Sequence, residues 1–216
     1  MTKIENLKVL IISFILISLT FIVQAKDLKI AYLDLTDDPR YDENLIYARI
    51  QLKPTGRPLI AVKIAEEESK MMGDALGINF ILENFSFDHI DNLNYFINKN
   101  DENFIYIVDL STADLKNLNQ NISKEEVIIF NVSSNDNSLR NEKCNKKIFH
   151  TIPSYNMLTD SLGQFLIKKN WKKVILLKGP HESDIQFAQS FKDSSNKMGI
   201  QIVEEKNFIL SNDPRE

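Results

Sequence analysis

Short polar side chains gather directly after three apolar runs of this sequence. Their hydroxyl, carboxylate and backbone N–H groups suit contact with a small polar ligand, because helix N-termini that follow strands offer unpaired donors. The same residue types also serve as helix N-caps, and this alternative applies to each of them individually. Since all three groups follow strands, we expect them to converge on one rim of a sheet. The candidate ligand-binding residues in these groups are Asp34, Thr36, Asp37, Asp109, Ser111, Thr112, Ser133, Ser134 and Asn135.

A tenth candidate is His181, which follows Gly179-Pro180 at the end of a later apolar run. The other two histidines, His89 and His150, lie far from it in the sequence, and no two of the three have the close spacing of a zinc site. We therefore expect no metal among them. His150 is expected to pack or to form a hydrogen bond within its own segment.

The acidic residues after the first apolar run do not form a calcium-binding loop. Asp34, Asp37, Asp38 and Asp42 lack the alternating spacing, the glycine and the terminal glutamate of such a loop. We expect them to be solvated acids of a loop, some of them in ion pairs. The candidate partners for such pairs are Arg40 and Arg49.

No catalytic motif accompanies these residues. The sequence contains no G-x-S-x-G elbow, no G-x-x-x-x-G-K-[ST] loop and no G-x-G-x-x-G loop, and it has only six glycines in all. A triad of Ser134, His150 and Asp136 can be drawn, but no motif supports it. The residues therefore indicate a binding protein that uses no cofactor, and not an enzyme.

The net charge and the cysteine content limit which classes of binding partner are expected. The formal net charge is −4 and the chain has no long run of lysine and arginine, which argues against nucleic acid and against an anionic membrane surface. Cys144 is the single cysteine. It is either a buried, inert thiol or a residue that pairs with a partner outside this chain.

The N-terminus has the pattern of a secretory signal peptide. Lys3 and Lys8 precede the apolar run 9–23, and Val23 and Ala25 are small or branched apolar residues three and one before a possible cut. We expect cleavage after Ala25 and export of the rest. The alternative is an uncleaved membrane anchor. A spanning helix needs about 20 apolar residues, and the run 9–23 is shorter than that.

Apolar runs and amphipathic stretches then alternate along the chain. Strands separated by helices predict right-handed βαβ units and a mostly parallel, doubly wound α/β sheet. Gly77 and Gly199 stand where left-handed helix C-caps belong. Two connections, 34–58 and 131–147, are much longer than the usual ~2–6 residues, and the first has room for an ordered piece at 45–52. The expected strands are 28–33, 78–82, 104–108, 127–130, 148–152, 174–177 and 200–203, and the expected helices are 59–76, 90–99, 113–119, 185–198 and one that opens at Pro153-Ser154.

The stretch 148–208 has a specific order of features. It contains an aromatic-x-Thr-x-Pro-Ser crossing, then a helix, then the basic-aromatic turn Asn170-Trp171-Lys172-Lys173, an apolar strand, and a helix that ends in glycine before another apolar strand. In this order it resembles the lobe-crossing stretch of the leucine/isoleucine/valine-type periplasmic solute-binding proteins of ABC transporters.

Three further stretches resemble one branch of that family. They are AYLDLTDDPRY (31–41), ARIQLKPTGRPL (48–59) and FNVSSNDNSLRNEKC (130–144). They are similar to the substrate-binding components encoded with quinoprotein (PQQ-dependent) alcohol dehydrogenase systems. Together with 148–208 they extend the resemblance over nearly the whole exported part.

The resemblance implies a type I periplasmic binding protein fold with two α/β lobes. The implied division is a signal peptide at 1–25, an N-terminal lobe at 26–150 and a partial second lobe at 151–216, because members of the family are about twice this length. The implied function is to bind a small solute in the periplasm for an ABC transporter permease, in association with PQQ-dependent alcohol oxidation. The alternative is a ligand-sensing domain that reports to a regulator without transport.

Two departures from the family concern the ligand. In this family, the proteins that bind amino acids hold the ligand with small residues and hydroxyl side chains that follow the fourth strand. Here that stretch is Val132-Ser133-Ser134-Asn135, without the usual Ala-Thr pair, and Asp109-Leu110-Ser111-Thr112 replaces the turn rich in glycine and serine after the third strand. The resemblance therefore does not carry an amino-acid ligand over to this chain.

Overall fold

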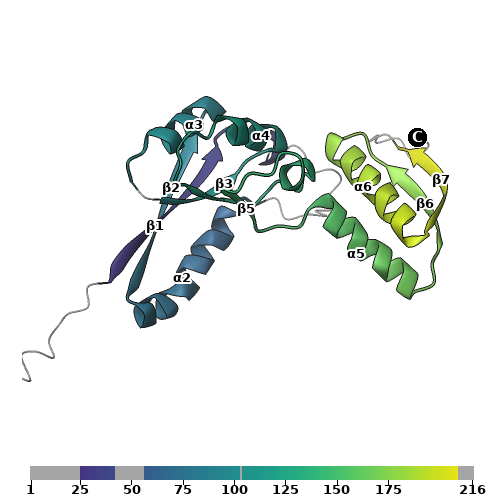
Figure 1. Ribbon diagram of the computed structural model, residues 1–216, viewed down its shortest axis with the longest axis horizontal. Coiled ribbons are helices and arrows are strands. Elements are labelled where there is room, and N and C mark those ends of the chain that lie inside the picture. Colours follow the sequence, from purple (N-terminus) through teal and green to yellow (C-terminus); the bar gives the residue numbers. More distant parts are fainter. Residues whose placement is uncertain (1–24, 42–55, 103, 209–216) are drawn as a thin grey trace, which may run out of the picture.

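A computed structural model describes residues 25–41, 56–102 and 104–208, and it arranges them as two α/β units that are joined by one crossing segment (Figure 1). The predicted signal peptide up to residue 24, the motif part 48–55 and the ordered piece expected at 45–52 lie outside the described residues. Among the helices that are described, none is both long and apolar enough to cross a membrane.

The first unit is built on a sheet of five parallel strands in the order β2-β1-β3-β4-β5. The chain alternates strands and helices, so each strand is followed by a crossover and the next strand runs parallel, as predicted. The α/β architecture with parallel sheets is confirmed. The strands are β1 (Lys26–Leu35), β2 (Ile78–Phe87), β3 (Phe104–Asp109), β4 (Ile128–Asn131) and β5 (Ile148–His150), and the helical segments are η1 (Pro39–Tyr41), α2 (Leu59–Leu76), α3 (Ile90–Lys99), α4 (Thr112–Asn121) and η3 (Ser138–Arg140).

The strand order reverses next to β1. The chain moves from β1 outward to β2 and then returns to the other side of β1 for β3. In open α/β sheets, such a reversal opens a crevice outside the carboxyl ends of the two strands that flank it. The carboxyl ends of β1 and β3 are therefore the place where this sheet can hold a ligand.

Helices cover the two faces of this sheet unequally. Figure 1 shows α3 and α4 on one face of the sheet and α2 on the other. Leu93 and Ile97 of α3 and Leu115 of α4 are fully buried against the strands, together with Tyr106 and Ile129. This apolar layer is the core of the first unit.

Helix α2 differs from the expectation drawn from its apolar spacing. Its C-terminus is as predicted, because Gly77 has φ 65° and caps the helix in the left-handed conformation. However, Ile64, Met72 and Leu76 on its apolar stripe are 51%, 61% and 62% exposed, and Gly73 is the one buried residue of the helix. Among the described elements, α2 packs mainly on β2, and much of its apolar stripe stays exposed.

The second unit contains two helices and a two-stranded parallel sheet. Its elements are α5 (Tyr155–Lys168), β6 (Lys173–Lys178), α6 (Glu182–Met198) and β7 (Gln201–Asn207). Ser154 caps α5, because its hydroxyl accepts from the backbone N–H of Met157 at 3.2 Å, and Gly199 ends α6 with φ 69°. The helix start at Pro153-Ser154 and the second glycine cap are thus both confirmed.

Candidate functional site

Polar residues at the carboxyl ends of β1, β3 and β4 form one continuous surface, which we call the rim. It consists of Asp34–Tyr41, Arg57, Asp109–Asp114 and Asn131–Asp136. Asp34 and Asp109 occupy paired positions on β1 and β3, directly at the reversal of strand order. The rim contains nine of the ten residues that the sequence singled out.

The carboxylate of Asp109 is the centre of this surface. It is completely buried, and it accepts hydrogen bonds from the hydroxyl of Tyr32 at 3.0 Å and from the hydroxyl of Tyr41 at 2.8 Å. The guanidinium of Arg40 donates to its other oxygen at 3.0 Å. Burial raises the pKa of both tyrosines, and the Asp109 charge adds to this effect, so both hydroxyls stay protonated as donors.

Arg40 joins Asp109 to the loop after β1. It also donates to the carboxylate of Asp38 from its Nε, at 3.0 and 2.9 Å. Burial alone would raise the pKa of Asp38, but the hydrogen bonds and the charge of Arg40 outweigh burial and lower it. The predicted pairing of a loop acid with Arg40 is confirmed, whereas the expectation of solvated acids is wrong for Asp34 and Asp38, which are 4% and 7% exposed.

Arg57 holds the end of β1 from the other side. Its guanidinium donates to the carboxylate of Asp34 at 2.9 Å, to the carbonyl of Leu35 at 3.0 Å and to the carbonyl of Thr36 at 3.1 Å. It also stacks over the ring of Tyr41, 4.7 Å from the centroid. Two arginines thereby fix the carboxylates that follow β1 and β3.

The serines after β4 are bound to the segment after β3. The hydroxyl of Ser133 accepts from the N–H of Leu110 and donates to its carbonyl, both at 2.9 Å. The hydroxyls of Ser134 and Thr112 are 2.9 Å apart, and Ser134 is 2% exposed. The structure therefore brings Thr112, Ser133 and Ser134 together, as a link between two strand ends.

Ser111 is a helix cap, as the alternative interpretation of these hydroxyls proposed. Its hydroxyl accepts from the N–H of Asp114 at 3.2 Å and donates to the Asp114 carboxylate at 2.6 Å. A carboxylate of the chain itself therefore lies at the N-terminus of α4, where the helix dipole favours negative charge.

Asn131 and Asp136 organise the loop after β4. The side-chain oxygen of Asn131 accepts from the N–H groups of Ser133 and Ser134, at 3.2 and 2.9 Å. Asp136 forms an ion pair with Lys116 at 2.8 Å. Burial would raise the pKa of Asp136, but Lys116 and the hydroxyl and N–H of Ser138 lower it.

The crossing between the two units is fastened to this loop. The guanidinium of Arg140 donates to the carbonyls of Asp136 at 2.8 Å, Ser134 at 3.3 Å and Ile152 at 2.9 Å. The side chain of Asn135 donates to the carbonyl of Pro153 at 2.7 Å. The rim and the entry to the second unit are thus one hydrogen-bonded assembly.

Three candidates remain outside these contacts between strand ends. Asp37 is exposed on the rim, and Thr36 donates from its hydroxyl to Asp88 at 3.4 Å. His181 lies in the second unit, where it is the exposed N-cap residue of α6 and its N–H donates to the Asp184 carboxylate at 3.2 Å. No contact between His181 and the rim is present among the described residues.

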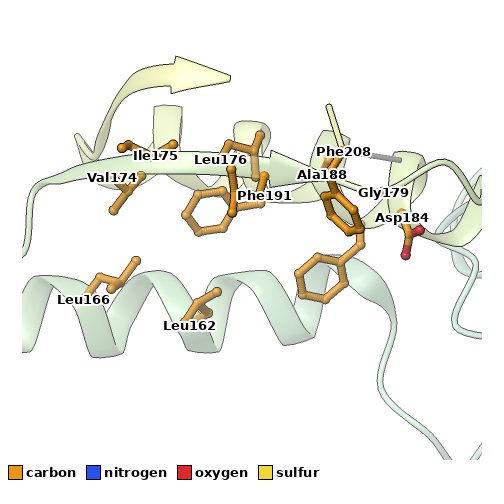
Figure 2. Close-up of a pocket in the computed structure, with 12 residues that line it drawn as sticks. Leu162, Leu166, Val174, Ile175, Leu176, Gly179, Asp184, Ala188, Phe191 and Phe208 are labelled. Atoms are coloured by element: carbon orange, nitrogen blue, oxygen red, sulfur yellow. The ribbon is translucent and has the colours of Figure 1, made fainter. Parts of the chain in front are cut away.

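Two cavities differ in their chemistry. A pocket of about 460 Å³ opens on the rim, and all of its lining residues except Pro39 have polar or charged side chains. A second hollow, of about 520 Å³, lies inside the second unit, where Leu162 and Leu166 point from α5 toward β6 and Asp184 is the single carboxylate, at one end (Figure 2). The second hollow is an incompletely filled apolar core, so the rim pocket is the candidate site for a polar solute. The rim pocket is lined by Thr36, Asp37, Asp38, Pro39, Tyr41 and Arg57.

Comparison with solved structures shows the same fold. The chain resembles an ABC transporter substrate-binding protein from Desulfitobacterium hafniense, with TM-score 0.64, 13% identity and coverage of 85% of this chain and 51% of that chain. A D. hafniense structure of that description in complex with Leu has TM-score 0.61, 14% identity and coverage of 85% and 51%. A solute-binding protein of an ABC transporter from R. palustris, in complex with benzoate, has TM-score 0.57, 11% identity and coverage of 86% and 49%.

The matched structures are longer than this chain. The chain spans about half the length of the structures that it matches. No curated protein matches its sequence. The model of the family described as periplasmic binding protein matches residues 99–213, which is more than half of the 216 residues. The chain therefore belongs to the periplasmic binding protein family.

Proposed function

We propose that this chain is the periplasmic substrate-binding component of an ABC-type transporter and holds a small polar solute between two α/β lobes. Its family and its fold support the general role. The observation that carries the proposal is the rim itself, where Asp34 and Asp109 flank the reversal of strand order and a polar pocket opens beside them. The lobes are 26–150 and 151–216, and the crossing at Thr151–Ser154 connects their sheets.

The connection between the lobes supports a hinge at the rim. The N–H of Tyr155, the first residue of α5, donates to the carbonyl of Asn135 at 2.9 Å. Burial, together with the carboxylates of Asp136, Asp184 and Glu182, raises the pKa of Tyr155. Tyr155 also lies edge-on to Phe187 of α6, with the ring centroids 6.0 Å apart, so α6 packs against the first residue of α5. Closure of such lobes around a solute is how binding proteins signal.

The finer parts of the proposal rest on the sequence. Export by a signal peptide cleaved after Ala25 places the protein in the periplasm, where an ABC transporter permease receives the closed form. The similarity of 31–41 and 130–144 to substrate-binding components of PQQ-dependent alcohol dehydrogenase systems supports a link to alcohol oxidation. Both stretches contribute to the rim, so the resemblance falls on the surface that would select the solute.

A ligand-induced shift of thermal stability tests this role. A solute that binds only the folded protein adds about 2.7 kcal/mol to the free energy of unfolding at one hundred times its Kd. A panel of amino acids, aromatic acids, alcohols and amines is added to the protein and the Tm is measured. We expect at least one class to raise the Tm.

Two matched variants locate the binding surface. Asp37→Asn removes an exposed charge from the rim pocket, and Asp74→Asn removes an exposed charge from the last turn of α2, at the opposite end of the sheet. The Tm shift should shrink with Asp37→Asn and stay unchanged with Asp74→Asn. If the two variants behave alike, the solute does not bind at the rim.

A further inference from the structure

The described cations in the rim, beside it, and in the loop that leads to the second unit already have partners. Arg40 is bound to Asp38 and Asp109, and Arg57 is bound to Asp34. The other two cations are occupied in the same way: Lys116 is bound to Asp136, and Arg140 donates to three backbone carbonyls. The positive charges of Arg40, Arg57 and Lys116 are therefore already compensated by carboxylates of the chain itself.

Several neutral donors of the rim are also occupied. The N–H groups of Ser133 and Ser134 donate to Asn131, and the N–H of Leu110 donates to the Ser133 hydroxyl. The hydroxyl of Ser134 pairs with Thr112. These hydroxyl and amide groups are of the kind that could hold an anion, and here they hold the strand ends together.

Carboxylates of the chain itself occupy two helix starts, that of α4 beside the rim and that of α6 in the second unit. Asp114 lies at the N-terminus of α4 and binds the Ser111 hydroxyl, and Asp184 lies in the first turn of α6 and accepts from the N–H of His181. A ligand anion would have to approach these helix ends against a fixed negative charge.

Acceptors, in contrast, remain available. Asp37 is exposed in the lining of the rim pocket. One carboxylate oxygen of Asp34, a residue that is 4% exposed, accepts no hydrogen bond from the described residues.

We infer that the solute carries no anionic group and binds by donating hydroxyl or ammonium hydrogens to the rim carboxylates. The inference rests on the proposed function and deepens it, because it names the chemistry of the solute. It also separates this chain from the structural neighbours that hold Leu or benzoate, both of which carry a carboxylate.

Two sets of matched solutes test the inference by calorimetric titration of the protein. The first set is leucine, leucinol and 3-methylbutanol, and the second is benzoate, benzylamine and benzyl alcohol. All members of the first set carry an isobutyl group and all members of the second carry a phenyl group, so the differences in affinity within a set arise mainly from the polar groups. We expect an amine or an alcohol to bind about tenfold more tightly than the carboxylate of its set, as one hydrogen bond to a charged group predicts. Preference for amines over alcohols identifies an ammonium ligand, and equal binding identifies a hydroxyl ligand.

Variants separate the charge effect from the shape of the site. Asp114→Asn keeps the hydrogen bonds of the α4 cap but removes its charge, so the affinity for benzoate should rise about threefold or more. Asp37→Asn should weaken leucinol more than 3-methylbutanol, and Asp74→Asn should change neither. Tm values of all three variants verify that the fold is kept.

The outcomes distinguish this inference from the proposed function. If leucine or benzoate is the tightest member of its set, the inference is overturned while the protein remains a solute binder. If no solute of any class binds, in these sets or in the wider panel, the proposed function fails and the inference fails with it.

Discussion

The two α/β units of this protein bury different kinds of side chain. In the first unit the completely buried residues are mostly apolar, as Leu93, Ile97 and Ile129 illustrate at 0% exposure. In the second unit the most deeply buried side chains are polar, with Thr159 at 0% and Ser195 at 1%. The two units are therefore stabilised by different interactions, although both are built from parallel strands and helices.

The second unit depends on the contact between its helices. The hydroxyls of Thr159 and Ser194 are 2.8 Å apart, and Ser194 also donates to Asp160 at 2.8 Å, so α5 and α6 are joined by hydrogen bonds. Its sheet contributes less, because Ile175 and Leu177 on β6 are 57% and 63% exposed. Burial of apolar area stabilises the first sheet far more than the second.

The largest difference between the units should appear when one isoleucine of each sheet is truncated. Ile129→Ala opens a cavity in the first core and should lower the free energy of unfolding by about 2–5 kcal/mol. Ile175→Ala removes a side chain that already faces solvent and should cost less than about 0.5 kcal/mol. Urea unfolding, monitored by circular dichroism, measures both. Equal losses for the two variants would show that the β6 face is covered in solution.

The sequence predicted the order of elements well, because apolar periodicity and glycine caps are local signals. Gly77 and Gly199 both adopt the left-handed conformation that their positions required. The ends of the strands were predicted less well. β2 continues to Phe87, five residues beyond its predicted end at Leu82, because polar residues such as Asn84 and Ser86 take ladder positions beside β1. Periodicity also showed that α2 has an apolar stripe, but it carries no information about which surface covers that stripe.

The candidate site was predicted as a set of hydroxyl and carboxylate groups at one rim, and the structure places nine of the ten residues there. What the sequence missed is how far those groups already satisfy one another. Arg57 lies 23 residues from Asp34 along the chain, and their side chains are 2.9 Å apart in the structure. Tyr32 belongs to the predicted strand 28–33, yet its hydroxyl reaches Asp109 across 77 positions. Long-range pairs of this kind leave no spacing signal in a single sequence.

An intermediate effect is expected at the junction that joins the two units. Arg140→Gln shortens the side chain and removes the Arg140 donor from the carbonyls of Asp136 and Ile152, which should cost about 1–3 kcal/mol, whereas the Ser134 carbonyl still accepts from Asn131 at 2.8 Å. Hydrogen exchange should quicken in 131–136 and 150–156 while the amides of α3 and β6 keep their protection. Arg140→Lys is the control. It retains one charged donor, so its stability and exchange rates should lie between those of the unmodified protein and of Arg140→Gln. Faster exchange throughout either unit would mean that Arg140 supports a core and not the junction.

The smallest effect should come from protonation of His150, which lies at the same junction. The side-chain nitrogen of Asn131 is fixed as a donor, because its oxygen accepts from two backbone N–H groups, so the Nδ1 atom of His150 at 2.9 Å must accept. Burial, and then the charge of Arg140, lower the pKa of His150 below its usual 6.5.

The direction of the pH effect follows from this lowered pKa. The folded protein binds the His150 proton less well than the unfolded chain, so stability is full above about pH 6.5 and declines as the pH falls below that value. Between pH 7.5 and 5.5, this residue should lower the Tm by no more than a few degrees. His150→Gln cannot be protonated in this range and should reduce the slope of Tm against pH, whereas His181→Gln, at an exposed position on α6, should keep the slope of the unmodified protein. A slope that His150→Gln leaves unchanged would show that the contact between His150 and Asn131 does not couple protonation to the junction.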